Sequence, residues 1–560
     1  MPKRRKKPSV PIVASPAEVA RPARQPATRE IDILAGIAAL ICIVFFFLSA
    51  GALNPDGVSY LDLATAIEHG DWSQFVQGYW SPLLPFITGI AGRVTGLTGP
   101  QLITVTHVLN LDAALGGLLI ICLWARRSPG TYFARAAIAA YMLCSAGLPR
   151  IEAVTPDVLL LAIAVWLSYE FLVHRSRRWL LVGVLLGLAF LAKTSSWPWL
   201  VIALPIRLWA AGDAPARRPV WWSTLVCGAL MLTWVVPMSI KYGHPTLGSS
   251  GRLNYSWYLA SNSSRMPDTD GGRNTAYRTV PVGNGRTVTV ATFDDAAHWT
   301  YQPWGDPTAW ESKVLTQTGH PPTAVQLLRY WGRLTLRILV LWLAPLILAV
   351  IAPVWILRRR RGMIHELVTT NRESFVVMLL GLAGLAQFAA VHAEPRLIAP
   401  FGAMLALGVI HWCGTSPAEQ IRVTAAPLRL GLAWLGMAAA LGFAAFRLKE
   451  GAGSYTRLHE VAKELDNLRS RLISAGQSNV RLAIVGPAAP VLASAYWIGA
   501  RIVMQIPPAY AELIATLPRD QQSQMLLTLF SGKVPLIWQT TSSGGMRMLL
   551  VPPPVTGASR

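Results

Sequence analysis

Long apolar runs separated by short, arginine-rich segments dominate this 560-residue chain. A run of about 20 apolar residues is long enough to cross the hydrocarbon core of a bilayer as a helix. By this criterion the chain has about eleven candidate spans. They lie at residues 31–53, 101–124, 133–149, 155–174, 178–195, 197–211, 220–240, 334–357, 374–391, 396–413 and 427–446. The pattern predicts a polytopic α-helical membrane protein, and a re-entrant pair is an alternative for the fifth and sixth spans.

The distribution of lysine and arginine predicts the orientation of these spans. A cytoplasmic N-terminus places the basic clusters, among them KRRKK near the start and RRRR at 358–361, on the cytoplasmic side, as positively charged loops prefer. Basic loops facing anionic lipid also account for much of the net charge of +22, so a nucleic-acid partner is not required. Residues 1–30 are predicted to be a disordered basic cytoplasmic tail.

Three polar segments fall on the outer face in this topology, which corresponds to the periplasmic or extracellular side of the inner (plasma) membrane. Outer loop 54–100 begins with an amphipathic stretch and predicts interfacial helices, with Asp62 on a solvated face. Outer loop 241–333 contains a β-hairpin signal at 277–293 around a Gly-Asn-Gly turn. The tail, 447–560, alternates helical and strand patterns and predicts a small soluble α/β domain with a partly parallel sheet after the transmembrane domain 31–446.

Two aspartates stand where predicted spans meet the outer face. Asp56 directly follows the first span, and its carboxylate is suited to be a general base for an acceptor hydroxyl or a ligand for a divalent cation. An N-cap for the helix that starts at Gly57 is the alternative role. Asp157 begins the fourth span in TPDVLLL, where the helix dipole also favours a carboxylate. Because both aspartates lie at the same depth, the two carboxylates are expected to converge.

Basic groups occupy the same depth. Lys193 ends the fifth span, and Arg396 precedes the tenth in HAEPRLIAPF. Either cation would neutralise a phosphate held at the bilayer surface, and the planar guanidinium of an arginine donates two hydrogen bonds together. His392 is a candidate hydrogen-bond donor to that phosphate, and Glu394 is a candidate ion-pair partner of Arg396.

Other polar groups are assigned structural roles. Asp112 lies in the middle of the second span with His107 and Asn110, which favours a buried polar contact between helices over a transport path. No His or Cys cluster has metal-ligand spacing, and no P-loop or nucleophile motif is present. No cofactor is therefore predicted, while a divalent metal at Asp56 stays open.

Several motifs resemble the C-type glycosyltransferase superfamily, in particular the bacterial relatives of protein O-mannosyltransferases and of the lipid A aminoarabinose transferase. NPDGVSYLDLA with YWSPLLPFITGI is similar to the first outer loop of the family, and TPDVLLL with FLAKTSSW to its middle spans. AEPRLIAPF is similar to a late Glu-x-Arg element of the family, with Leu397 where tyrosine is common. Gly57 departs from the Asp-Glu pair that many members have in the first loop.

The resemblance implies an inverting transfer of a sugar from a polyprenyl-phosphate donor to a glycan, lipid or protein acceptor on the outer face. It places Asp56 at the catalytic acidic position and the basic residues Lys193 and Arg396 at the donor phosphate. A polytopic transporter or lipid flippase is the alternative from another class, and a catalytically inactive scaffold of the same fold is a third reading.

Overall fold

The computed structural model describes a defined part of the chain, and all structural statements below refer to this part. The described residues are 27–49, 51–127, 131–146, 151, 153–174, 178–212, 214–259, 275–283, 286–293, 299–310, 323–333, 336, 371–392, 394–415, 438, 441–442, 445, 449, 459–476, 480–530, 534–540 and 546–550. The predicted spans 334–357 and 427–446 lie outside it except for isolated positions, as does most of the predicted tail 1–30.

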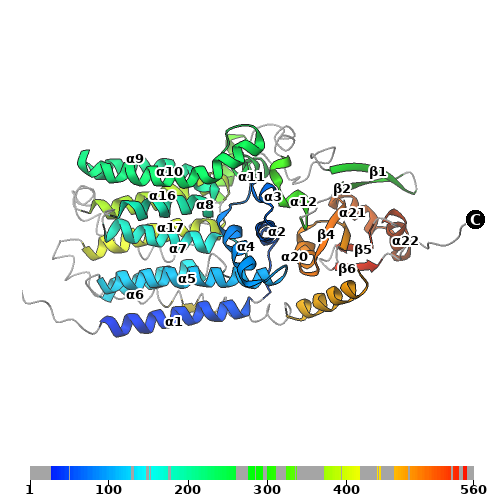
Figure 1. Cartoon of the computed structure of the whole chain (residues 1–560), viewed down its shortest axis with the longest axis horizontal. Helices are drawn as coiled ribbons and strands as arrows, with labels where there is room; N and C mark the ends of the chain where they lie inside the picture. Colours follow the sequence, from blue (N-terminus) through cyan, green and yellow to red (C-terminus); the bar gives the residue numbers. More distant parts are fainter. Residues whose placement is uncertain are drawn as a thin grey trace, which may run out of the picture.

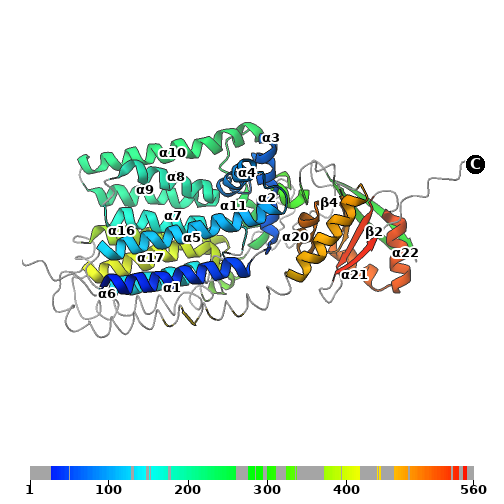
Figure 2. The same cartoon turned by 60° about the horizontal axis from the view of Figure 1, so that its bottom comes forward.

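Long helices pack side by side in a bundle (Figures 1 and 2). They are α1 (Ala27–Leu48), α5 (Gln101–Arg127), α6 (Thr131–Ala146), α7 (Asp157–Leu172), α8 (Trp179–Ala192), α9 (Trp197–Ala211), α10 (Ala214–Tyr242), α16 (Arg372–Val391) and α17 (Pro395–Thr415). Four of them contain apolar segments long enough to cross a membrane: Arg29–Leu48, Gln101–Arg127, Pro215–Tyr242 and Pro395–Trp412. With several such helices side by side, the chain is a multi-pass membrane protein.

Small residues let the helices of the bundle approach closely. A Cβ atom added to Gly183 of α8 would lie 2.6 Å from the carbonyl oxygen of Ser223 in α10. One added to Gly381 of α16 would lie 2.7 Å from the backbone nitrogen of Leu405 in α17. Glycine at such contacts permits tight van der Waals packing, which drives helix association where lipid replaces water.

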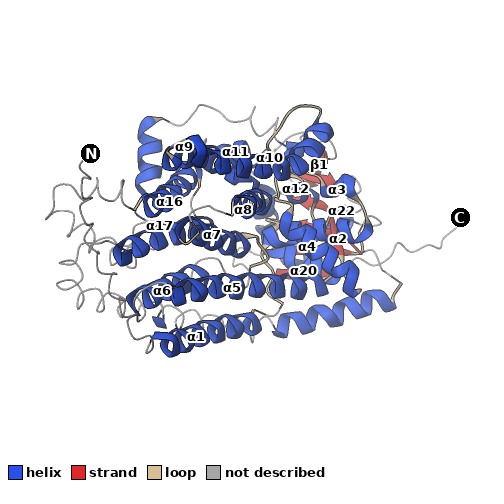
Figure 3. Cartoon of the chain, turned by 60° about the vertical axis from the view of Figure 1, so that its left-hand side comes forward, coloured by secondary structure: helices blue, strands red, loops and turns tan. Residues whose placement is uncertain are grey.

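Short helices form a layer between the bundle and a β-sheet (Figures 1 and 3). They are α2 (Pro55–His69), α3 (Trp72–Phe75), α4 (Leu83–Thr95), α11 (Ser250–Tyr258) and α12 (Gln302–Gly305). The prediction of an amphipathic surface helix at α2 is wrong, because residues 57–64, 66 and 67 are all buried. α2 packs against α4 on one side and reaches α20 (Ala489–Ile498) beside the sheet on another.

The sheet has six strands in the order β1-β2-β4-β3-β5-β6. The strands are β1 (Thr275–Gly283), β2 (Arg286–Phe293), β3 (Val480–Val485), β4 (Ala500–Ile506), β5 (Leu536–Thr540) and β6 (Met546–Leu550). In the sequence α20 lies between β3 and β4, and α21 (Pro508–Ala515) and α22 (Arg519–Phe530) lie between β4 and β5. β3 pairs in parallel with β4 and β5, and the other pairs are antiparallel.

The hairpin in loop 241–333 belongs to this sheet. The predicted hairpin at 277–293 is present as β1 and β2. The sequence gives no sign, however, that β2 pairs antiparallel with β4, through Ala291 opposite Gln505 and Thr292 opposite Met504. The outer loop and the C-terminal tail therefore build one sheet.

A buried carboxylate lies where α2 meets the strand region. Asp62 is 5% exposed, and its carboxylate accepts hydrogen bonds of 2.9 Å from both the backbone N–H and the hydroxyl of Thr300. Burial raises the pKa of Asp62 to about 7, and the two hydrogen bonds oppose that rise. The prediction of a solvated Asp62 is therefore wrong, because the segment around Thr300 covers that side chain.

The predicted polar contact within α5 is only partly present. Ring nitrogens of His107 lie 2.9 Å from the carbonyl oxygen of Ala52 and 3.3 Å from that of Ile151, and Asn110 donates to the carbonyl oxygen of Ala153 over 2.9 Å. Asp112 instead has an exposed side chain. The histidine and the asparagine fix the segments that enter α2 and α7, and the aspartate takes no part in that contact.

Candidate active site

A cavity of about 830 Å³ opens at the end of the bundle that faces the short helices. Five of the six site residues proposed from the sequence line it: Asp56, Lys193, His392, Glu394 and Arg396. Its walls come from α2, α11, the turn between α8 and α9, and the turn between α16 and α17. Segments far apart in the sequence thus meet around one space.

Local packing at the start of α2 sets the position of Asp56. Pro55 opens the helix, and the side chain of the preceding Asn54 accepts a 3.0 Å hydrogen bond from the backbone N–H of Val154. A Cβ atom on Gly57 would lie 2.7 Å from Cβ of Val154. Glycine at this position therefore lets the first turn of α2 lie directly against the segment that leads into α7.

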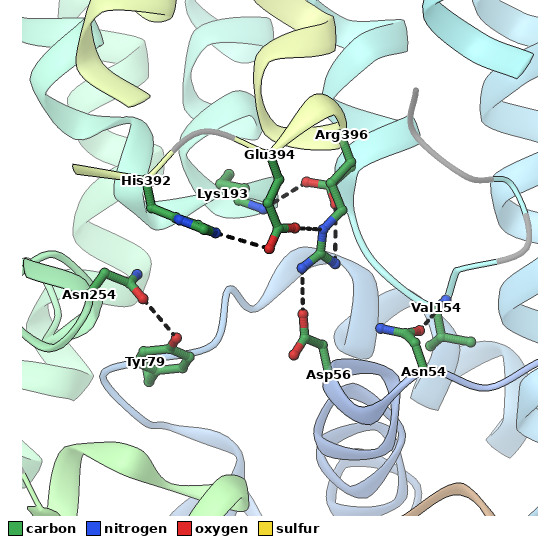
Figure 4. Close-up of polar contacts among 10 residues, drawn as sticks. Asn54, Asp56, Tyr79, Val154, Lys193, Asn254, His392, Glu394 and Arg396 are labelled. Atoms are coloured by element: carbon green, nitrogen blue, oxygen red, sulfur yellow. Dashed lines mark hydrogen bonds and ion pairs between the residues drawn. The ribbon is translucent and has the colours of Figure 1, made fainter. Parts of the chain in front are cut away.

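Arg396 joins Asp56 from the opposite wall, as Figure 4 shows. Its Nη2 donates to Oδ2 of Asp56 over 2.7 Å, and its Nε donates to Oε2 of Glu394 over 2.6 Å. The expected ion pair between Arg396 and Glu394 is therefore present. Asp56 is 23% exposed, so the carboxylate is held by the arginine while it remains open to the cavity.

A second ion pair lies behind this one. Nζ of Lys193, at the C-terminal end of α8, donates to Oδ1 of Asp157 over 2.7 Å. Asp157 is the first residue of α7 and only 1% exposed, and its Oδ2 lies 3.8 Å from Nη1 of Arg396. The two aspartates thus converge on the same guanidinium. Asp157 does not itself line the cavity, but it contacts Lys193 and lies beside Arg396, which both do.

His392 and Glu394 lie in the turn between α16 and α17. Nε2 of His392 is 3.0 Å from Oε1 of Glu394. The His392 ring stacks on Tyr258 of α11, with 3.7 Å between the ring centroids and 7° between the planes. Burial disfavours the charged form of Glu394, but the hydrogen bond from His392 and the adjacent Arg396 outweigh it and hold the pKa of that carboxyl well below its usual range. Glu394 is therefore ionised at neutral pH.

The cluster combines three carboxylates with two basic side chains. The carboxylates of Asp56, Asp157 and Glu394 all lie within 4 Å of Arg396, and Lys193 supplies a second permanent positive charge. Among the described residues, no group of three or more His, Cys, Asp or Glu side chains is arranged to hold a metal ion. An anionic ligand entering the cavity would compete with these carboxylates for the same two cations.

Two tyrosines at the site were not proposed from the sequence. Tyr60 lines the cavity one helical turn after Asp56, and burial raises the pKa of its hydroxyl well above the usual range. Tyr60 could have been predicted from its i+4 spacing from Asp56, because residues four apart lie on the same face of a helix. Tyr258 is one of many aromatic residues in loop 241–333, and nothing in the sequence distinguishes it from its neighbours.

Comparison with known proteins finds similar solved structures but no similar sequence family or curated protein. No family model matches the sequence, and no curated protein matches it. Among solved structures, ArnT from Cupriavidus metallidurans bound to undecaprenyl phosphate aligns over 92% of this chain and 94% of its own, with 12% identity and a TM-score of 0.51. The apo state of ArnT aligns over 93% and 94%, with 12% identity and a TM-score of 0.49.

At this identity the alignment with bound ArnT establishes the fold, and it extends over both the bundle and the C-terminal part of the chain. The chain therefore has the fold of ArnT, as the resemblance of its motifs to the lipid A aminoarabinose transferase predicted.

Proposed function

We propose that the protein is a membrane glycosyltransferase that moves a sugar from a polyprenyl-phosphate donor to an acceptor on the outer face of the inner membrane. The observation that carries the proposal is the meeting of Asp56 and Arg396, distant in the sequence, in a cavity at one end of the bundle. The fold of ArnT, which binds undecaprenyl phosphate in one solved structure, supports a lipid-linked donor.

Asp56 acts as the general base. Its Oδ2 is engaged by Arg396, and its Oδ1 makes no hydrogen bond to another described residue. Oδ1 takes the proton of the acceptor hydroxyl while the acceptor oxygen attacks the anomeric carbon of the donor. The bond from that carbon to the phosphate oxygen breaks, and its electron pair leaves with the polyprenyl phosphate. A single displacement of this kind inverts the anomeric centre.

Arg396 and Lys193 stabilise the departing phosphate. A guanidinium has five N–H groups and an ammonium has three, so both side chains keep donors beyond those used by the carboxylates. Fixed cations aimed at a position where negative charge develops are an effective means of lowering a reaction barrier. Asp157 holds both cations in place, because it contacts Lys193 and lies beside Arg396.

The proposed orientation follows from the two ends of the bundle. α5 ends with Arg126 and Arg127, and α2 carries Asp56 in its first turn. The C-terminal end of α5 lies away from the short helices, whereas α2 lies at the opposite end of the bundle (Figure 2). Basic residues favour the cytoplasm, which supports a cavity on the periplasmic or extracellular side. In this arrangement the N-terminus is cytoplasmic, loops 54–100 and 241–333 are external, and 447–560 is an external domain.

Replacement of the base provides the test. Asp56→Asn is expected to reduce transfer by about 10²- to 10⁴-fold, since it removes the group that accepts the proton. Envelope glycans of a strain lacking the gene, complemented with the wild type or the variant, are compared by mass spectrometry. The variant is expected to leave the same glycan missing as the empty strain.

Asp112→Asn is the matched control, because it makes the same chemical change at an exposed position away from the cavity. Size-exclusion chromatography of both purified variants checks that they fold. A folded Asp56→Asn variant that restores the glycan in full would sink the proposed role of Asp56.

A further inference from the structure

Tyr258 has a position that the proposed reaction does not use. It is the last residue of α11, and its ring covers the face of His392 in a parallel stack. A histidine at the end of α16 could rotate about its side-chain bonds, and an aromatic surface 3.7 Å away restricts the plane of its ring. The stack therefore fixes the direction in which Nε2 of His392 points.

The direction of that nitrogen matters because two further contacts depend on it. Nε2 of His392 meets Oε1 of Glu394 at 3.0 Å, and the other oxygen of Glu394 accepts from Nε of Arg396 at 2.6 Å. A guanidinium is planar, so a bond at Nε determines the plane of the whole group. That plane brings Nη2 to within 2.7 Å of Asp56.

α11 is itself firmly held, so Tyr258 stands on a rigid element. Leu253 and Trp257 are buried in an aromatic cluster with Tyr79 and Trp304. The hydroxyl of Tyr79 donates to Oδ1 of Asn254 over 3.3 Å, as Figure 4 shows. The backbone N–H of Ser249, just before the helix, donates to the carbonyl oxygen of Gly78 over 2.7 Å. These contacts tie α11 to the loop between α3 and α4.

We propose that Tyr258 is a positioning residue that orients Asp56 through His392, Glu394 and Arg396. The inference rests on the proposed function, and it assigns His392 and Glu394 to orienting the arginine and not to touching the donor phosphate. Glu394 fits this role because a carboxylate and a phosphate repel each other. The wall of the cavity made by α11 thereby controls the geometry of the opposite wall made by α2.

Three variants on α11 separate this role from a structural one. Tyr258→Leu removes the aromatic face and is expected to lower kcat by about 10- to 100-fold, because small displacements of reacting groups cost that much, while the acceptor KM stays unchanged. Tyr258→Phe keeps the face and is expected to retain wild-type kcat. Tyr255→Leu alters an exposed tyrosine of the same helix and is expected to have no effect.

A double variant tests the connection to Arg396. Glu394→Gln interrupts the chain downstream, so adding Tyr258→Leu to it is expected to cost no further activity. Additive losses would overturn the proposal, as would equal kcat values for Tyr258→Leu and Tyr255→Leu. If Tyr258→Leu does not fold, His392→Gln removes the other ring of the stack while it keeps a donor for Glu394, and unchanged kcat there contradicts the proposal.

The Asp56→Asn variant distinguishes the two hypotheses. If it is inactive while Tyr258→Leu is fully active, only the positioning role fails. If Asp56→Asn is fully active, the proposed base fails and the positioning role fails with it.

Discussion

Asp56 and Asp62 lie on the same helix, six positions apart, and they occupy opposite chemical environments. Asp56 faces a cavity and pairs with the permanent charge of Arg396. Asp62 is buried against the strand region and accepts two hydrogen bonds from the neutral Thr300. Asp56 keeps one carboxylate oxygen open to the cavity beside a cation, whereas burial favours the protonated form of Asp62 and the two donors of Thr300 hold its carboxyl group in place. One end of α2 is thus suited to chemistry and its middle to assembly.

After Asp56→Asn, the largest expected effect comes from the arginine beside Asp56. Arg396→Lys keeps the charge but loses the planar fork that contacts Asp56 and Glu394 at once, so kcat is expected to fall about 100-fold. The matched change is Arg501→Lys, since Arg501 acts on Asp62 through its charge alone. Transfer assays on both variants test the difference. Equal activities would show that the cavity needs only a point charge at position 396.

A smaller effect is expected at the contact that brings α2 to α7. Gly57→Ala places a Cβ atom 2.7 Å from Cβ of Val154, and relief of that overlap displaces the first turn of α2. Overpacking of this kind costs about 1–3 kcal/mol of stability. Gly36→Ala in α1 is the control, because an added Cβ there meets nothing within 4 Å. Thermal unfolding in detergent compares the two, and an unchanged melting temperature for Gly57→Ala would contradict the role given to this glycine.

The smallest effect concerns stability as a function of pH. The pKa of Asp62 in the folded protein, about 7, lies above its ordinary value of 3.8. Between these pH values the unfolded chain loses the proton first, so the contribution of Asp62 to stability falls as pH rises from about 4 to about 7 and is constant above. Asp62→Asn keeps an acceptor oxygen for the backbone N–H of Thr300, can donate its amide N–H to the hydroxyl oxygen of Thr300, and removes this dependence.

The Asp62→Asn variant is therefore expected to melt at a higher temperature than the wild type at pH 8, with little difference at pH 4 and unchanged transfer activity. Thermal unfolding at the two pH values measures this. The same difference in melting temperature at both pH values would mean that Asp62 does not titrate as its surroundings indicate.

The bundle and the polar ends of its helices could be predicted from the sequence because both depend on local patterns. Apolar runs give the positions of the spans, and charged residues at the run ends gave Asp56, Lys193 and Arg396. These side chains approach one another because helix ends on the same face share one depth. Their detailed pairing could not be predicted, since it depends on which helices are neighbours.

The burial of α2 and the composition of the sheet could not be predicted from local patterns, for a different reason. α2 has an apolar stripe that is typical of a surface helix, yet its remaining face is also buried, with Asp62 against Thr300 and with α12 and α20 packed beside it. That sheet forms only when β2 pairs with β4, and no periodicity within either strand specifies the other. Tyr258 was missed likewise, because its importance lies in the ring of His392 and not in its own neighbours.

The pairing of β2 with β4 also has a consequence for biogenesis. Ala291 is translated more than two hundred positions before its partner Gln505, so the edge of β2 that pairs with β4 stays open until the C-terminal strands have been made. Tyr301, which bridges to β4 beside Ile502 and donates to Gln505, ties the segment carrying Trp304 of the cavity wall to the same late strand. The cavity wall that carries Trp304 is therefore completed last, and a prematurely terminated chain would form its helices without enclosing a site.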